Sequence, residues 1–264
     1  MFFQIYKALR NFLHKCVSLR FRSSKFINLK KRALFNWSSG KDSTLALYKI
    51  LQQNEYEIVS FLTSISEEYQ RVSMHGIRVD LLQEQVKNLG FPLTLMSVPN
   101  MPTMETYEKK MEQTLHHFRQ NGVEYSIFGD IFLEDLRQYR EEKLKNVDFK
   151  AIFPLWKQNT TELIQEFLTL GFKTIVTCVN EQYLDKSFVG RIIDEQFIAD
   201  LPKNVDPCGE NGEFHTFTFD GPLFSKPVSF EKGEIVRKTY PKPQTENTDD
   251  DSDYGFWYCD LIPN

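Results

Sequence analysis

Short apolar runs alternate with longer segments of helical periodicity over residues 31–131. The apolar runs predict four buried strands, at 33–37, 58–63, 93–98 and 125–128. The segments between them gather apolar side chains on one helical face and predict helices at 43–53, 77–88 and about 103–120. Strands that alternate with helices of this length predict an α/β fold, an open, mostly parallel and doubly wound sheet with helices on both faces.

The pattern is less regular from residue 132 onward and predicts a smaller α+β unit packed at the carboxyl edge of that sheet. Helices are expected at 133–146, at 160–170 and through much of 185–200, and strands at 151–153, 172–179 and 214–219. Residues 241–253 are rich in Pro, Thr, Asn and Asp, which predicts an acidic loop. The aromatic segment 254–262 predicts a strand that docks back at a sheet edge.

These patterns divide the chain into four parts. They are a basic N-terminal extension (1–30), a first α/β domain (31–131), a C-terminal unit (132–238), and the acidic loop with its terminal strand (239–264). Residues 1–32 hold nine Lys/Arg and no Asp/Glu. This leader lacks the apolar core and cleavage site of a secretory signal. An organelle transit peptide is one interpretation, and we prefer the simpler one of an extra segment or an upstream start codon.

Without these nine residues, 23 Lys/Arg face 36 Asp/Glu, a formal charge of −13 for the rest of the chain. Such an acidic body repels nucleic-acid phosphates, so no nucleic-acid partner is expected. No apolar stretch approaches the roughly 18 residues of a membrane span, so no membrane partner is expected either. The four cysteines form no C-x-x-C pair, which argues against a zinc ribbon and favours a reduced, cytoplasmic protein.

The candidate chemistry lies at Ser38-Ser39-Gly40-Lys41-Asp42-Ser43, between the first predicted strand and the first predicted helix. A helix N-terminus presents unpaired N–H groups and a partial positive charge, which together bind anions. Gly40 lets the backbone approach a phosphate, Lys41 adds a charge, and the serine hydroxyls add donors. Asp42 either caps the helix or holds Mg²⁺ on the phosphates. The segment therefore predicts a site for ATP.

Two other phosphate motifs do not fit. A Walker A loop needs Gly and Ser/Thr where this chain has Phe35 and Asp42, and no G-x-G-x-x-G loop is present. A Ser-capped helix with a solvated Lys41 remains the structural alternative. The segment resembles the PP-loop of ATP pyrophosphatases, a family of HUP-type fold that cleaves ATP between its α and β phosphates. Ser39 stands where most members have a second glycine, which the loop tolerates if Ser39 keeps a negative φ.

Three further stretches resemble the diphthine–ammonia ligase-like branch of that family. They are Ser73-Met74-His75-Gly76, Gly129-Asp130-Ile131, and GENGEFHTF at 209–217 followed by Asp220-Gly221-Pro222. They match the signatures M-H-G, G-D-I and G-E-x-G-E-[FY]-x-T-F…D-G-P. The resemblance covers roughly residues 31–235.

This resemblance implies an ATP-dependent carbon–nitrogen ligase that adenylates a carboxylate, releases pyrophosphate, and lets ammonia displace AMP. It implies catalytic roles for Lys41, Asp42, Glu210 and Glu213, with Mg²⁺ at Asp42 and clustered carboxylates deprotonating ammonium. Nucleotide contacts are implied for Ser38, Ser39, Gly40, Lys41, Asp42, Ser43, His75, Gly76, Gly129 and Asp130. Acceptor contacts are implied for Gly209, Gly212, Thr216 and Asp220. The expected partners are ATP, ammonia and a carboxylate acceptor, which is diphthine on elongation factor 2 or, in a bacterial source, an unknown substrate.

Several of these residues have a structural alternative. For His75 the alternative is a loop histidine without a functional role, and for Asp130 it is a helix cap. For the two glycines of the third signature, Gly209 and Gly212, the alternative is a role in turns only. His215 alternates with phenylalanines and is left out of the site. Arg137 and Arg140, one helical turn apart and close to Glu141, predict a solvated helix face.

Two other functions stay open: the same ATP chemistry on another small molecule or a tRNA, and a non-catalytic nucleotide-binding regulator. The acidic body argues against a tRNA, and the clustered acids at 210–220 argue against a regulator. Association into a homodimer is also left open.

Overall fold

The computed structural model describes residues 30–73, 75–100, 102–240 and 254–264. The predicted basic extension (apart from Lys30), Met74 of the second signature, and the acidic segment 241–253 lie outside the described residues. Met1–Lys30 and Lys31–Asn264 are separate units, and the second holds all the described helices and strands. Across the described ranges, every helix falls short of the length or apolarity that crossing a membrane requires.

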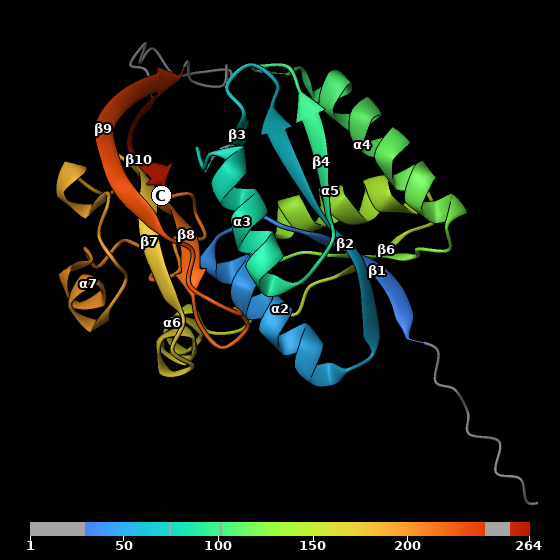
Figure 1. Ribbon diagram of the computed structural model, residues 1–264, viewed down its shortest axis with the longest axis horizontal. Coiled ribbons are helices and arrows are strands. Elements are labelled where there is room, and N and C mark those ends of the chain that lie inside the picture. Colours follow the sequence, from blue (N-terminus) through green and yellow to red (C-terminus); the bar gives the residue numbers. More distant parts are fainter. Residues whose placement is uncertain (1–29, 74, 101, 241–253) are drawn as a thin grey trace, which may run out of the picture. The chain divides into compact units, whose positions relative to one another are not determined.

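The apolar runs of the N-terminal half form the first sheet (Figure 1). Its strands are β1 (Lys31–Asn36), β2 (Tyr56–Ser66), β3 (Arg71–Val72), β4 (Leu93–Val98), β5 (Tyr125–Ile127) and β6 (Lys150–Ile152). Their order is β3-β2-β1-β5-β6, and β4 also pairs with β2. Every pairing is parallel except that of β2 with β3. The predicted open and mostly parallel sheet is therefore confirmed.

Helices cover both faces of this sheet, as predicted. They are α2 (Lys41–Gln53), α3 (Val79–Leu89), α4 (Met104–Gln120) and α5 (Glu134–Lys145). Neighbouring residues of β1 point to opposite faces. Phe35 packs into the apolar cluster that contains Leu47 of α2, whereas Leu34 packs into the cluster with Leu115 of α4 and Leu144 of α5.

The second half adds an antiparallel sheet in the order β8-β7-β10-β9. Its elements are α6 (Thr160–Thr169), β7 (Lys173–Asn180), the short 3₁₀ helix η1 (Lys186–Phe188), α7 (Glu195–Asp200), β8 (Phe214–Asp220), β9 (Phe230–Tyr240) and β10 (Tyr254–Pro263). Figure 1 shows these strands in yellow to red, beside the blue helix α2.

Three expectations about this half were wrong or incomplete. The terminal strand is not at an edge, because β10 lies between β7 and β9. The stretch 185–200 is helical only at its two ends. Its middle hydrogen-bonds to β7 instead, with Gly190 N–H donating to the Val176 carbonyl (2.8 Å) and Ile193 N–H to the Thr174 carbonyl (3.0 Å). Strand β9 was not predicted, since charged residues occupy much of its exposed length.

The segment between β1 and α2 is held between the two sheets. The Thr218 N–H of β8 donates to the Ser39 carbonyl (3.0 Å). The Gln85 amide of α3 donates to the same carbonyl (2.9 Å) and to the Thr218 carbonyl (2.6 Å), and accepts from Trp37 Nε1 (2.8 Å). This buried network fixes the loop relative to both halves of the fold.

Candidate functional site

A cavity of about 1150 Å³ opens where the carboxyl ends of β1, β2 and β5 face the second sheet. Ligands of open α/β sheets bind at this edge. Its described lining includes most of the predicted site: Ser38, Gly40, Lys41, Asp42, Ser43, His75, Gly129, Asp130, Gly209, Glu210, Gly212 and Thr216. Within the part of the chain that the structure describes, four predicted site residues do not line the cavity: Ser39, Gly76, Glu213 and Asp220.

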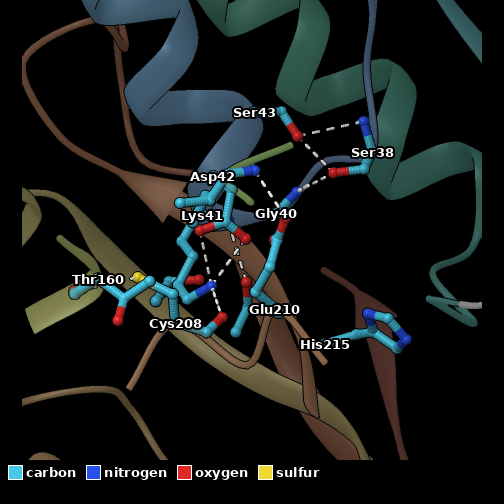
Figure 2. Close-up of polar contacts among 12 residues, drawn as sticks. Ser38, Gly40, Lys41, Asp42, Ser43, Thr160, Cys208, Glu210 and His215 are labelled. Atoms are coloured by element: carbon cyan, nitrogen blue, oxygen red, sulfur yellow. Dashed lines mark hydrogen bonds and ion pairs between the residues drawn. The ribbon is translucent and has the colours of Figure 1, made fainter. Parts of the chain in front are cut away.

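The loop before α2 has the features of an anion site. Helix α2 starts at Lys41, and its N-cap residue Gly40 provides no side-chain cap. The first N–H groups of a helix lack intrahelical partners. That of Lys41 donates to Thr216 Oγ1 (3.0 Å), and the N–H groups that follow it, together with the helix dipole, favour an anion here. The hydroxyls of Ser38 and Ser43 contact each other, and Gly40 N–H donates to Ser38 Oγ (3.3 Å) (Figure 2). Asp42 lies in the first turn and does not cap the helix.

Ser39 does not meet the condition of a negative φ under which the loop was said to tolerate a serine at this position. Its φ is 71°, in the left-handed region that favours glycine. The reason lies in its carbonyl, which both Gln85 and Thr218 bond and thereby hold in place. Its hydroxyl is buried, with no hydrogen-bond partner in the described part of the chain.

Lys41 is 3% exposed and carries the charge of the site. Its Nζ donates to both carboxylate oxygens of Asp42 (2.8 and 2.7 Å) and contacts the Cys208 carbonyl (Figure 2). Burial alone would lower the pKa of Lys41, but the adjacent Asp42 carboxylate outweighs that effect, and the pKa is raised. Lys41 is therefore a cation at neutral pH.

Glu210 joins the third signature to the G-D-I loop. Its Oε1 accepts from the Ile131 N–H (2.6 Å) and the Phe132 N–H (3.3 Å). Burial, followed by repulsion from Asp42, raises the pKa of Glu210 to about 7. A carboxyl group with that pKa can accept or release a proton at neutral pH.

Glu213 and Asp220 lie behind this surface. Glu213 is fully buried, and its Oε1 accepts from the Asp206 N–H (3.0 Å) and from Asn211 Nδ2 (3.0 Å). It therefore shapes the loop that presents Glu210. Asp220 ends β8 and pairs with Lys173 (2.8 Å). Both side chains therefore contact other protein groups and do not face the cavity.

Two glycines allow close approach of backbone segments. A Cβ on Gly129 would lie 3.0 Å from Ser43 N, so only glycine lets the G-D-I loop lie against the start of α2. Gly209 has a φ of 68°, and a Cβ there would lie 2.9 Å from the Phe214 ring.

Sequence reasoning missed Arg140. Arg137 does pair with Glu141 (2.7 Å) on the outer face, as predicted. Arg140 instead lines the cavity, pairs with Asp130 (2.9 Å) and lies 4.4 Å from the centroid of the Phe128 ring. The available signal was the spacing of Leu133, Leu136 and Arg140, which share one helical face just after the G-D-I loop.

His215 was also missed, and it pairs with the predicted His75. The two ring centroids are 4.6 Å apart, and both rings line the cavity. Burial lowers the pKa of His75 to about 4 and lowers the pKa of His215 well below its ordinary value, so both imidazoles are neutral at pH 7. Nothing in the alternation of β8 distinguishes His215 from the phenylalanines beside it.

Comparison with known proteins matches both halves of this fold. The family model of the diphthamide synthase N-terminal domain covers residues 30–151, and that of the diphthamide synthase C-terminal domain covers residues 159–240. The human (Homo sapiens) diphthine–ammonia ligase is 31% identical over 183 residues, which are 64% of this chain and 67% of that protein. The diphthine–ammonia ligase of Bos taurus is 33% identical over 110 residues, 39% of this chain and 41% of the bovine protein, so this match spans less than half of that relative. Together these matches show that the chain belongs to the diphthamide synthase family.

Proposed function

We propose that this chain is a cytoplasmic, ATP-dependent amide ligase that adenylates a carboxylate and transfers ammonia to it. The proposed acceptor is diphthine, the substrate in the name of its relatives. The observation that carries the proposal is the position of Lys41. It is a buried cation at the N-terminus of α2, whose N-cap residue Gly40 provides no side-chain cap, in the same cavity as a carboxyl group with a pKa of about 7. In this proposal residues 31–131 bind the nucleotide, and residues 132–238 bind the acceptor beside it.

The phosphate groups of ATP fit the donors of the loop. The N-terminus of α2, Lys41 and the hydroxyls of Ser38 and Ser43 would bind and orient them. Mg²⁺ usually binds through one or two carboxylates together with phosphate oxygens. Asp42 lines the cavity and would hold the ion, which would neutralise phosphate charge. No cluster of three or more His, Cys, Asp or Glu side chains poised for a metal occurs among the described residues.

The reaction would proceed in two steps. An acceptor carboxylate oxygen attacks the α-phosphorus of ATP, and the bond to the β-phosphate oxygen breaks as pyrophosphate leaves. Lys41 stabilises the negative charge that develops on the phosphates. Ammonia then attacks the acyl carbon, AMP leaves, and the proton lost by nitrogen passes to the Glu210 carboxylate.

The test is chromatography of the nucleotide products. The purified chain is incubated with Mg-ATP, ammonium and diphthine-bearing elongation factor 2. AMP and pyrophosphate are expected, and Lys41→Ala should abolish both. Lys49→Ala is the matched control, because Lys49 is on the same helix but pairs with Glu166 outside the cavity lining. ADP as the product, or ATP binding without turnover, would contradict the proposal, and the second result would favour a regulator. Activity that nuclease treatment removes would indicate a nucleic-acid acceptor.

A further inference from the structure

The loop that carries His75 lies against the start of α2 and is held there by a distant strand. We name residues 75–77, between β3 and α3, the His75 loop, and residues 38–43 the phosphate loop. His75 lines the cavity, and a Cβ on Gly40 would lie 3.5 Å from its Cε1 atom. His75 Nδ1 is buried and has no hydrogen-bond partner within the described part of the chain. Because such a buried polar atom is costly to leave unbonded, it indicates a contact with a ligand.

Two arginines join the base of this loop to β10. Arg71 and Arg78 face each other in an antiparallel bridge, one on each side of the loop. Arg71 Nη1 donates to the Gly76 carbonyl (2.7 Å) and to Asp260 Oδ1 (2.8 Å). Arg78 donates from Nε to Asp260 Oδ1 (3.1 Å) and from Nη2 to Asp260 Oδ2 (2.6 Å). The Asp260 carboxylate of β10 therefore holds both guanidinium groups, and one of them holds the backbone of the loop.

Asp260 is ionised and lies outside the cavity. Burial alone would raise the pKa of Asp260, but the hydrogen bonds from Arg78 and Arg71 outweigh that effect and lower the pKa to about 2. Hydrogen bonds between charged groups are stronger than those between neutral groups. The described lining of the cavity contains none of these three side chains. They can therefore influence a bound ligand only through the His75 loop.

Other contacts from the second sheet fix the same loop. Gly76 has a φ of 71°, and a Cβ there would lie 3.1 Å from Cδ1 of the Tyr258 ring in β10. The Thr177 hydroxyl of β7 donates to the His75 carbonyl (3.3 Å). The direction in which His75 points is thus set by strands of the second sheet, although the loop itself belongs to the first half of the chain.

We propose that Asp260 is a positioning residue of the nucleotide site, which acts through Arg71 and the Gly76 carbonyl to hold His75 against the phosphate loop, where His75 Nδ1 hydrogen-bonds to bound ATP. This inference rests on the proposed function and adds to it a residue of the last strand. Asp260 lies outside the residues that the family models match, 30–151 and 159–240. The family comparison therefore assigns it no role.

A double-mutant cycle tests whether Asp260 acts through His75. Binding of Mg-ATP to the full chain is measured by isothermal titration calorimetry for the wild type, Asp260→Asn, His75→Ala and the double variant. Each single change should weaken binding about tenfold, the loss expected for one good hydrogen bond. The double variant should bind no more weakly than His75→Ala, because a positioning residue has no effect once the group that it positions is gone. Independent losses that multiply to about a hundredfold, or wild-type affinity in Asp260→Asn, overturn the proposal.

Two further variants separate positioning from stability. Arg71→Lys keeps a positive charge beside Asp260 but loses the planar fork that bonds both Asp260 and the Gly76 carbonyl. It should keep the melting temperature near that of the wild type and still weaken ATP binding, and an unchanged affinity contradicts the proposal. Asp200→Asn is the matched control, because it breaks another Asp–Arg pair of the second half, with Arg191 (2.7 Å), outside the cavity lining. It should leave the ATP affinity unchanged, and a loss equal to that in Asp260→Asn would refute a specific role of Asp260.

The two proposals fail in different ways. A wild-type chain that does not bind Mg-ATP would remove the proposed function and this inference with it. ATP binding and AMP formation that Asp260→Asn leaves unchanged would retain the ligase and remove only the role of Asp260.

Discussion

Glu210 ties the pH response of this protein to one carboxyl group. A glutamate in an unfolded chain has a pKa of about 4.3, and in the folded chain burial and Asp42 raise the pKa of Glu210 to about 7. Between these values the folded state binds more protons than the unfolded state at this position. The contribution of Glu210 to stability therefore falls as pH rises from about 4.3 to about 7. The buried Glu210 carboxylate thus lowers the stability of the fold near neutral pH, and its proposed role as a proton acceptor accounts for its presence there.

Replacing Glu210 by Gln should remove the contribution of this residue to the pH dependence of stability and to the pH dependence of AMP formation. The Gln side chain can still accept from the Ile131 and Phe132 N–H groups, so the loop is preserved. AMP formation in the wild type should rise with pH to a plateau above about 7, whereas Glu210→Gln should be slow and lack this step. In denaturant unfolding, the wild type should lose stability relative to the variant as pH rises toward 7. A pH–rate profile that is the same in both proteins would contradict this role.

Gly129 tests whether the G-D-I loop must touch the phosphate loop. An alanine Cβ would lie 3.0 Å from Ser43 N and 3.1 Å from the Asp42 carbonyl carbon, so one backbone segment has to move. We expect Gly129→Ala to cost about 1–3 kcal/mol of unfolding free energy and to weaken ATP binding. Gly90→Ala is the control, because its φ of 79° strains alanine far from the cavity. It should lower the melting temperature and leave the ATP affinity unchanged.

At the scale of elements, Gln85 of α3 connects the two sheets through the phosphate loop. Gln85→Met keeps the volume but leaves the buried Trp37 N–H without its partner. It also removes one hydrogen bond from the Thr218 carbonyl and one from the Ser39 carbonyl, which keeps its bond from the Thr218 N–H. An unpaired buried N–H alone costs about 1–3 kcal/mol, and the loop should also bind ATP more weakly. Urea unfolding and ATP titration measure the two effects. Gln165→Met, which removes an exposed bond to Glu195, should change neither.

Elements with a clear period were predictable, and those defined by distant partners were not. Residues 93–98 form β4 as predicted, and α3 is followed by Gly90 in the left-handed conformation that glycine adopts readily at a helix end. Strand β9 was missed because its exposed side chains are largely charged. The stretch around Gly190 looks helical in isolation, yet β7 offers it backbone partners that only the folded chain provides.

The same limit applies to the site. The phosphate loop and Glu210 belong to local motifs, so their signal is contained in a few consecutive residues. Arg140 and Tyr258 reach the cavity from two separate elements and have no such motif. His215 lies within the third signature, but at a position where that signature specifies no residue. Their proximity depends on how the second sheet packs against the first, which hydrophobic periodicity does not encode.

At the scale of the whole molecule, the position of β10 makes the second sheet depend on residues 254–263. β10 pairs with both β7 and β9, and its Cys259 and Leu261 are buried in the main core. Deleting residues 254–264 should expose the edge of β7 and part of that core, so we expect aggregation or loss of a cooperative thermal transition. Ile262→Ala, at a position that is 42% exposed, is the mild control and should keep the transition. A soluble truncated chain with an unchanged melting temperature would contradict this dependence.

The interior position of β10 also has a consequence for the order in which the protein can fold during its synthesis. The first sheet is built from residues 31–152 and can form while the chain is still emerging from the ribosome. The second sheet cannot close until residues 254–263 have left the exit tunnel, because β7 and β9 meet only through β10. Until then the phosphate loop lacks the support of a completed second sheet. A nascent chain should therefore acquire nucleotide binding in one step, when β10 has emerged.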